Sequence, residues 1–360
     1  YRWSVGSLSI NGYEYSLVQG GISGNTNDWY LTSEASQVAP EGGAYIGTQQ
    51  ATRTMFDHGL QDRASKRSLG ADRQDSGLWM RAQGRHDKGM RMAEGKVDID
   101  SSSDVVQMGG ALLRRPVGAQ GALYAGLMAG YGDARIDSTS TLMRRDTNTA
   151  VRAKAHGKVS GYSAGVYGTF YADDVNRLGA YVDTWLQYGR YTNRLSSELG
   201  SADYDSNLWS ASLESGYALA PFAADSPFRA WVVEPRGQLI YSRYTARAAD
   251  LQDTRLRNGT ADAWRSSIGV RLYQQPGQAA DESVLRPFVE TNWLHSEAVP
   301  SVRMGSNSFD ARPSRDALEL KVGAQLRVAR DVELSSHLFG HSGSASEYGY
   351  GGQLSLSYSW

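Results

Sequence analysis

The chain has 360 residues, enough for one large domain or two of ordinary size, and it contains no cysteine. Its formal net charge of −1 at pH 7 gives no electrostatic reason to expect nucleic-acid binding. A mean hydropathy of −0.48 and the lack of a long apolar run exclude a transmembrane helix. A membrane-spanning β-barrel is not excluded, because only every second residue of its strands has to be apolar.

Residues 1–33 are predicted to form short strands. Tyr13, Tyr15 and Leu17 alternate with polar residues, and Gly20 and Gly21 mark a turn. A segment of this size cannot bury a core of its own. We therefore expect it to continue a β-structure that lies upstream in a longer protein.

The stretch from Pro40 to about residue 67 is predicted to be a helix, because it contains good helix formers and no second proline. About 26 helical residues would span roughly 40 Å, enough to cross a bilayer. Its apolar residues do not form a stripe broad enough for a core helix, and Arg53 and Asp57 forbid contact with lipid. Taken alone, the stretch is typical of a solvated linker helix; the alternative is a helix enclosed in a polar cavity.

From Gly77 onward the dominant pattern is alternation of apolar and polar residues, repeated about twelve times, as strands with two different faces require. A soluble β-sandwich shows the same alternation, so the pattern alone leaves sandwich and membrane barrel open. The last strand shows it most clearly, with one face formed by Leu354, Leu356, Tyr358 and Trp360.

Two observations favour the barrel. Connections near 87–99, 138–155, 194–204, 245–260 and 297–315 are long, at about 11–19 residues, whereas most of those between them are short, as in outer-membrane barrels. The polar faces also carry charges of both signs along strand centres, which suits a water-filled lumen. The residues predicted to line that lumen are Arg81, Arg85, Asp183, Glu214, Glu234, Arg236, Arg265, Arg271, Glu290, Glu319 and Lys321.

The predicted fold class is therefore all-β: a transmembrane antiparallel barrel of about twelve strands with an N-terminal helix through its pore. A lumen of this width would leak if it were empty, and one helix about 10–12 Å across fits it. We expect Arg53, Asp57, Asp62 and Arg63 to pair with the charged lining. The full set of predicted pore-helix residues is Tyr45, Gln49, Arg53, Asp57, Asp62 and Arg63.

The order of these elements resembles a known family. A strand-rich segment ends in NDWYLTS, the helical region contains FDHGLQDR, the first barrel strand reads GLWMRAQGRH, and later strands read LYAGLMAGYGDARI and GAYVDTWLQYGRY. In order and spacing, over essentially the whole chain, this resembles the C-terminal translocator unit of the monomeric (type Va) autotransporters, closest to the diffuse-adherence-adhesin type.

The resemblance implies three parts: residues 1–33 as the tail of a β-helical passenger, residues 34–76 as a linker with the pore helix, and residues 77–360 as the outer-membrane barrel. It implies a monomer that anchors its own passenger and exports it to the cell surface. The partners would be outer-membrane lipid, the barrel-assembly machinery and that passenger, with no cofactor. The apolar face from Leu354 to Trp360 looks like the signal that the assembly machinery reads. The activity of the passenger, adhesion among others, stays open.

Self-cleavage is a further possibility, since some family members cut their own linker through a cyclising asparagine or through acidic residues. Asn25 and Asn27 precede the helix and no asparagine occurs from residue 28 to residue 147, so the asparagine route is closed within the helix. The acidic route stays open because three carboxylates lie along the path: Glu41, Asp57 and Asp62.

Two rival functions fit a barrel of this kind: a porin, and an outer-membrane enzyme with an active site at the rim. Candidate rim residues are His86, Asp87, His295 and Glu297, although charges at a rim are ordinarily just solvated. The six histidines show no metal-binding spacing and no nucleophile motif is present. We therefore predict no catalytic residue and no metal site.

Overall fold

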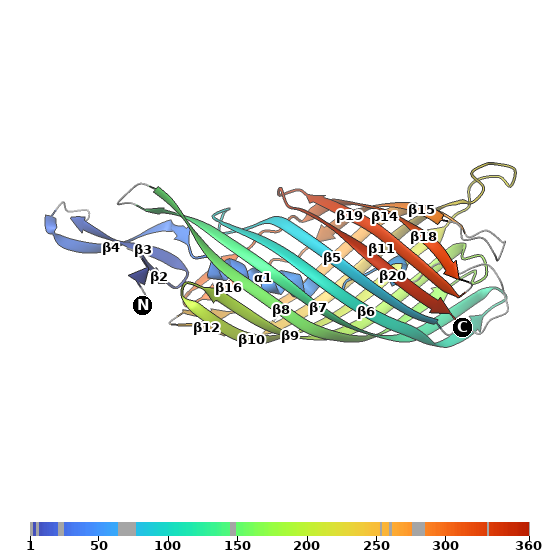
Figure 1. Ribbon diagram of the computed structural model, residues 1–360, viewed down its shortest axis with the longest axis horizontal. Coiled ribbons are helices and arrows are strands. Elements are labelled where there is room, and N and C mark those ends of the chain that lie inside the picture. Colours follow the sequence, from blue (N-terminus) through green and yellow to red (C-terminus); the bar gives the residue numbers. More distant parts are fainter. Residues whose placement is uncertain are drawn as a thin grey trace.

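Twelve strands close into one antiparallel barrel in the computed structural model, so the fold predicted from alternation is confirmed (Figure 1). Each strand pairs with its neighbours, and the last strand pairs with the first through the register Leu356–Met80. The structure describes residues 3–4, 7–20, 25–63, 77–144, 149–252, 254–258, 261–275, 285–329 and 331–359. The barrel strands are β5 (Gly77–Met92), β6 (Val97–Val117), β7 (Gly121–Arg144), β8 (Thr149–Tyr171), β9 (Gly179–Ser197), β10 (Gly200–Ala218), β11 (Trp231–Ala246), β14 (Ala261–Gln274), β15 (Leu285–Ser296), β18 (Asp316–Ala329), β19 (Val332–Gly343) and β20 (Tyr348–Ser359).

Three of the predicted long loops are mostly strand. Residues 93–96 alone separate β5 from β6, and residues 198–199 alone separate β9 from β10. β7 is 24 residues long and β8 is 23, about twice the length that crosses a bilayer. The polar composition near 87–99, 138–155 and 194–204 suggested loops, but backbone pairing needs no apolar side chains, so the strands continue beyond the membrane.

The other two long connections fold into a separate sheet with the strand order β12-β13-β16-β17. Leu256, Val302 and Met304 of this sheet are buried in the same apolar cluster as the first helix. The sheet therefore caps one end of the lumen. Its strands are β12 (Ala249–Leu251), β13 (Thr254–Arg257), β16 (Ser301–Met304) and β17 (Asn307–Asp310).

A small N-terminal sheet projects from the capped end of the barrel (Figure 1). The turn at Asn11 and Gly12 contacts the cap: the Asn307 side-chain amide donates to the Asn11 carbonyl at 3.0 Å, and the Tyr13 ring meets Phe309 edge-on at 5.2 Å. Gly12 has φ +89°, and a Cβ there would lie 2.3 Å from the Met304 methyl. The strands of this sheet are β1 (Trp3–Ser4), β2 (Ser7–Ile10), β3 (Tyr13–Gly20) and β4 (Asn25–Val38).

Inward-facing aromatic rings lie over glycines of neighbouring strands. A Cβ on Gly126 would lie 2.5 Å from the ring of Tyr167, and one on Gly109 would lie 2.6 Å from the indole of Trp79. The Trp79 indole N–H donates to the Tyr167 hydroxyl at 3.3 Å. These glycines allow large rings to pack flat against the wall and leave the lumen open for the chain inside it.

Candidate functional site: a lumen filled by the chain

The barrel encloses two short helices, α1 (Glu41–Thr54) and α2 (Leu60–Arg63) (Figure 1). Pro40 precedes the first helical residue, as the sequence predicted, and its fixed φ suits that position. The single helix expected over about residues 40–67 is broken: residues 55–56 form a turn, residues 57–59 have no regular secondary structure, and residues 64–67 lie outside the described residues. Neither helix in the described part of the chain is both long and apolar enough to cross a membrane.

The break has a local cause at Gly59. A Cβ on Gly59 would lie 2.8 Å from the guanidinium of Arg236 and 3.0 Å from the carboxylate of Glu214. The Leu60 N–H donates to that same carboxylate at 2.9 Å. The Leu60 N–H is therefore bonded to the barrel wall, whereas in a continuous helix it would donate to a carbonyl one turn earlier.

The first half of the lumen is apolar, contrary to the expectation of polar surroundings for the whole helix. Gly43 and Gly47 face the wall. A Cβ on Gly43 would lie 2.2 Å from the Ser138 hydroxyl oxygen and 2.8 Å from Val97. A Cβ on Gly47 would lie 2.4 Å from Ile136. Glycine at these positions lets α1 approach the wall closely. Because part of the contacting face consists of glycine, the sequence shows no apolar stripe.

Tyr45 and Gln49 of the predicted pore-helix set are fully buried in this half. The Tyr45 ring stacks on Tyr204 with centroids 5.0 Å apart, and the Thr48 and Tyr204 hydroxyl oxygens are 2.5 Å apart. α1 is thus held mainly by packing and by hydrogen bonds between neutral groups.

Arg53 corrects another expectation. It is 1% exposed and pairs with no carboxylate of the described residues; its guanidinium lies 5.8 Å from the centroid of the Tyr244 ring. The Arg53 guanidinium also donates to the Ala261 backbone carbonyl at 3.4 Å, and the Arg53 backbone carbonyl accepts a hydrogen bond from Arg265 at 2.9 Å. An aromatic face and backbone groups replace the expected ion pair.

The second half of the lumen is charged, and there the other three predicted pairs occur. Arg63 forms a buried ion pair with Asp183, and Asp57 forms one with Arg265. The Lys321 ammonium nitrogen lies 3.5 Å from a carboxylate oxygen of Asp62.

The predicted lining residues all lie on inward strand faces, and several of them pair with one another. Arg236 pairs with Glu290 at 2.6 Å and with Glu214 at 3.4 Å, and Arg271 pairs with Glu290 at 3.2 Å. The Gln61 amide donates to Glu234 at 3.0 Å. Further contacts of the lining include Arg81 to Gln107 at 2.8 Å, Arg85 to Asp87 at 2.7 Å, and Lys321 to Glu319 at 3.9 Å.

A family model for the autotransporter β-domain matches residues 78–337. The chain belongs to this family.

Its relatives agree with that assignment. It is 28% identical to the Escherichia coli K12 protein YdeU over all of this chain and 83% of that one, and 25% identical to the Escherichia coli autotransporter adhesin AIDA-I over 97% of this chain. That match spans only 28% of AIDA-I. The crystal structure of the AIDA-I transport unit has the same fold, with a TM-score of 0.73 at 22% identity, covering 90% of this chain and 100% of that one.

An autotransporter β-domain is the outer-membrane part of a protein that exports its own passenger. The chain is therefore an outer-membrane translocator that anchors its passenger at the cell surface, and α1 and α2 lie inside its barrel. Because the exported passenger lies N-terminal to the barrel, we assign the end with the N-terminal sheet and the cap to the outside, and the opposite end, where β5 begins and β20 ends, to the periplasm (Figure 1).

Three wall glutamines were not among the residues singled out from the sequence. Side-chain amides donate to backbone carbonyls of the enclosed chain: Gln187 to Phe56 at 3.3 Å, Gln238 to His58 at 2.9 Å and Gln353 to Asp62 at 3.0 Å. They satisfy carbonyls of the break and of the short helix α2, which have no intrahelical donors. The alternation predicts that these glutamines lie on the polar faces of their strands. It does not predict the carbonyls that they contact, because those carbonyls are exposed by the break in the helix.

The rim candidates are not gathered into one site. His86 lies on β5 and His295 on β15, and β18, β19 and β20 separate these strands. His295 contacts Asp316 at 2.8 Å, whereas Asp87 pairs with Arg85 and lies 3.3 Å from His341.

The apolar face of the last strand points outward. Leu354, Leu356 and Tyr358 are 51%, 39% and 45% exposed, as expected for side chains in contact with lipid. Trp360 lies outside the described residues.

Proposed function

We propose that Glu41–Arg63 is the last part of the exported chain to enter the barrel and that it is retained there as a plug. The observation that carries the proposal is the two-part fit of this segment: glycines against an apolar wall near the outer end, and ion pairs with Asp183, Arg265 and Lys321 near the periplasmic end. Neither fit would be available to an arbitrary stretch of passenger.

In this proposal, each of three segments of the chain has its own role. Residues 1–33 are the end of the passenger, residues 34–76 are the linker with the pore helix, and residues 77–360 are the barrel. Folding of the passenger outside the cell would bury apolar area that cannot easily be exposed again, which gives export a direction without nucleotide hydrolysis. The contact of the Asn11–Gly12 turn with the cap supports a passenger end that rests on the barrel.

The proposed partners beyond the passenger are outer-membrane lipid and the barrel-assembly machinery. The machinery would recognise the outward face of the last strand, formed by Leu354, Leu356, Tyr358 and Trp360. The barrel closes on itself through β20 and β5, which supports function as a monomer.

We further propose that the chain has no catalytic activity of its own. Two of the three carboxylates that could act on the linker, Asp57 and Asp62, are held by Arg265 and Lys321, and the buried Glu41 stands at the start of α1. Prolonged incubation of the folded protein, followed by intact-mass measurement, should recover only the full-length chain. A product cut near Glu41, Asp57 or Asp62 would refute this part.

The retained plug can be tested in cells with a reporter passenger fused upstream. Gly47→Val places two methyl groups against Ile136 and should displace α1, whereas Gly237→Ala, with its nearest neighbour 3.8 Å away, is the matched control. The Gly47 variant should still expose the reporter at the surface but admit a normally excluded antibiotic several-fold faster. Unchanged permeability, with α1 shown to be displaced by loss of a Gly43→Cys/Ser138→Cys crosslink, would contradict the proposal.

A further inference from the structure

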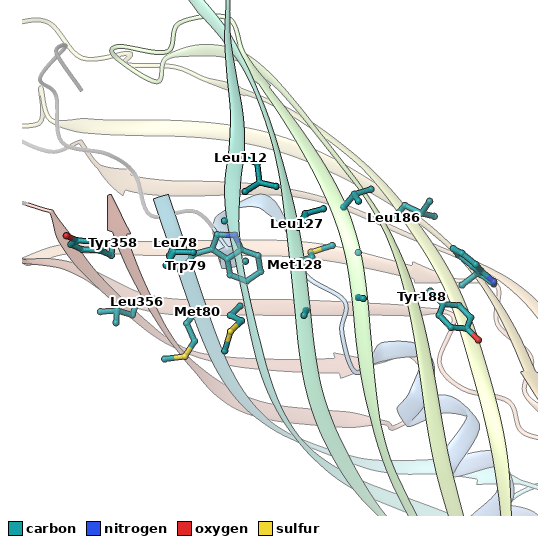
Figure 2. A pocket seen from close by; sticks show the side chains of 18 residues that line it. Leu78, Trp79, Met80, Leu112, Leu127, Met128, Leu186, Tyr188, Leu356 and Tyr358 are labelled. Atoms are coloured by element: carbon teal, nitrogen blue, oxygen red, sulfur yellow. The ribbon is translucent and has the colours of Figure 1, made fainter. Parts of the chain in front are cut away.

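An apolar groove of about 1000 Å³ crosses the outside of the barrel wall (Figure 2). It is lined from β20 through β5 to β10, and its labelled side chains run from Leu356 and Tyr358 on one side to Leu186 and Tyr188 on the other. Within the described part of the chain, no residue of the two helices or of the cap lines the groove. Two of its lining residues, Trp79 and Met128, come from the inner face of the wall and are reached between the outward side chains.

Strand pairing explains why the wall is hollow here. One outward row runs across the sheet through Met108, Ala129, Ala164, Tyr188 and Trp209, each paired with the next. Two alanines thus stand side by side between large side chains. In the next outward row towards the periplasm Gly110 stands between Leu78 and Leu127. Three small residues on adjoining strands therefore form the floor, and larger apolar residues form the walls.

The groove lies in the periplasmic half of the barrel. Leu78 and Met80 stand near the start of β5, and Leu356 and Tyr358 near the end of β20, which are the periplasmic ends of those strands. Trp209, Leu127 and Tyr358 are each at least 45% exposed on this outward face, which the translocator turns to the bilayer. The groove is therefore continuous with the lipid-contacting surface and opens into the periplasmic leaflet, which is phospholipid.

A bulge beside the groove places an arginine at its periplasmic end. The register of β6 shifts between Ala111 and Leu113, so that Arg114 faces inward, where it donates to Asp174 at 2.7 Å. Arg115 pairs with the outward Leu123 and is exposed on the same face. Arg115 stands three positions after Leu112 of the groove wall, about 10 Å along a strand. The glycerol group of a phospholipid joins its acyl chains to its phosphate, so an acyl chain in the groove places the phosphate on the side of Arg115.

We propose that this groove binds one acyl chain of a phospholipid from the periplasmic leaflet, with Arg115 contacting its phosphate. A chain lying on Gly110, Ala129 and Ala164 gains contact with side walls that a flat barrel face does not offer. The guanidinium at the end of the groove supplies a charge-assisted contact and favours anionic headgroups. The site thus holds a lipid in a fixed position on the barrel wall.

The test uses the folded full chain in nanodiscs that contain phosphatidylglycerol with a photoactivatable acyl chain. Peptide mass spectrometry should find the label concentrated on the segments around residues 108–112, 127–129 and 164–166. Ala129→Leu/Ala164→Leu fills the groove and should reduce that labelling at least five-fold. Ala324→Leu, which changes an outward alanine of β18 outside the groove, is the control and should leave it unchanged.

The headgroup contact is tested separately by competition between phosphatidylglycerol and phosphatidylethanolamine. Arg115→Gln should remove the preference for the anionic lipid while labelling of the groove persists, and Arg190→Gln, an outward arginine of β9, should not. Labels spread evenly around the barrel, or unaffected by filling the groove, would overturn the acyl-chain site. An unchanged lipid preference in Arg115→Gln would overturn the role of the arginine. All variants should keep the gel mobility of the folded barrel, so that a loss of labelling reports the groove.

Discussion

Arg63 and Asp183 form an ion pair in which each side chain is only 1% exposed, and this pair ties the enclosed chain to β9 near the periplasmic end of the lumen. The Thr169 hydroxyl donates to the same Asp183 carboxylate, and the Arg63 guanidinium lies 4.1 Å from the centroid of the Tyr167 ring. Two buried charges stabilise each other, and removal of either one leaves the other buried without a partner, which destabilises the folded protein. The main effect of the pair is therefore to fix the position of the end of α2 in the lumen, and its net contribution to stability is smaller.

The first prediction concerns this pair. Arg63→Met and Asp183→Asn should each lower the free energy of unfolding by about 3–5 kcal/mol, because each leaves a buried group without its partner. The double variant should lose less than the sum of the two. Urea unfolding in detergent, analysed as a double-mutant cycle, measures the coupling; fully additive losses would mean that the two groups do not interact.

The second prediction concerns the fit of α1 to the wall. Gly47→Ala should destabilise the folded protein by about 1–3 kcal/mol, because its Cβ would lie 2.4 Å from Ile136 in a packed region. Gly237→Ala has room for its methyl group and should change stability by much less. Equal effects of the two substitutions on the unfolding midpoint would show that α1 does not press on the wall.

The third prediction concerns the periplasmic turn between β8 and β9. Asp174 lies 2.7 Å from Arg114 and 3.1 Å from Arg177. Burial by itself would raise the pKa of Asp174, but the two arginines outweigh it and hold the pKa below its ordinary value. A carboxyl with a lowered pKa stabilises the folded state above the unfolded-state pKa of about 3.9, and this contribution is lost as the pH falls through the folded-state pKa.

Asp174→Asn should therefore be less stable than the wild type by a constant amount between pH 7 and pH 5. The difference should shrink below about pH 4, where the wild-type carboxyl is protonated as well. Thermal unfolding across this pH range measures the difference, with Asp225→Asn in the next periplasmic turn as the control. If the difference in stability between the wild type and Asp174→Asn instead grew as the pH fell, the pKa of Asp174 would be raised in the folded state and the prediction would be wrong.

The fourth prediction concerns the contact between the N-terminal sheet and the cap. Gly12→Ala would strain a backbone with φ +89° and place a methyl group against Met304 and Phe309. The Asn11–Gly12 turn should then leave the cap, and amide exchange of the cap strands β16 and β17 should accelerate at least ten-fold while barrel strands such as β9 keep their protection. Unchanged exchange would show that the turn and the cap are independent.

The barrel and its filled lumen were predictable because alternation places each charge on a definite face. Glu214, Glu234 and Lys321 face inward for that reason, as the sequence indicated. The break at residues 55–59 was not predictable, because it depends on Glu214 and Arg236, more than 150 residues away along the chain. Arg53 was assigned an ion pair because its ring partner, Tyr244, lies on a strand whose position opposite α1 emerges only from the closed barrel.

The central claim is that residues 41–63 close the pore, and single-channel recording in planar lipid bilayers tests it most directly. The intact chain should show small and infrequent current steps. The variant lacking residues 41–63, with its barrel verified by gel mobility, should show a large and persistent conductance. Equal conductance of the intact and shortened chains would contradict the claim.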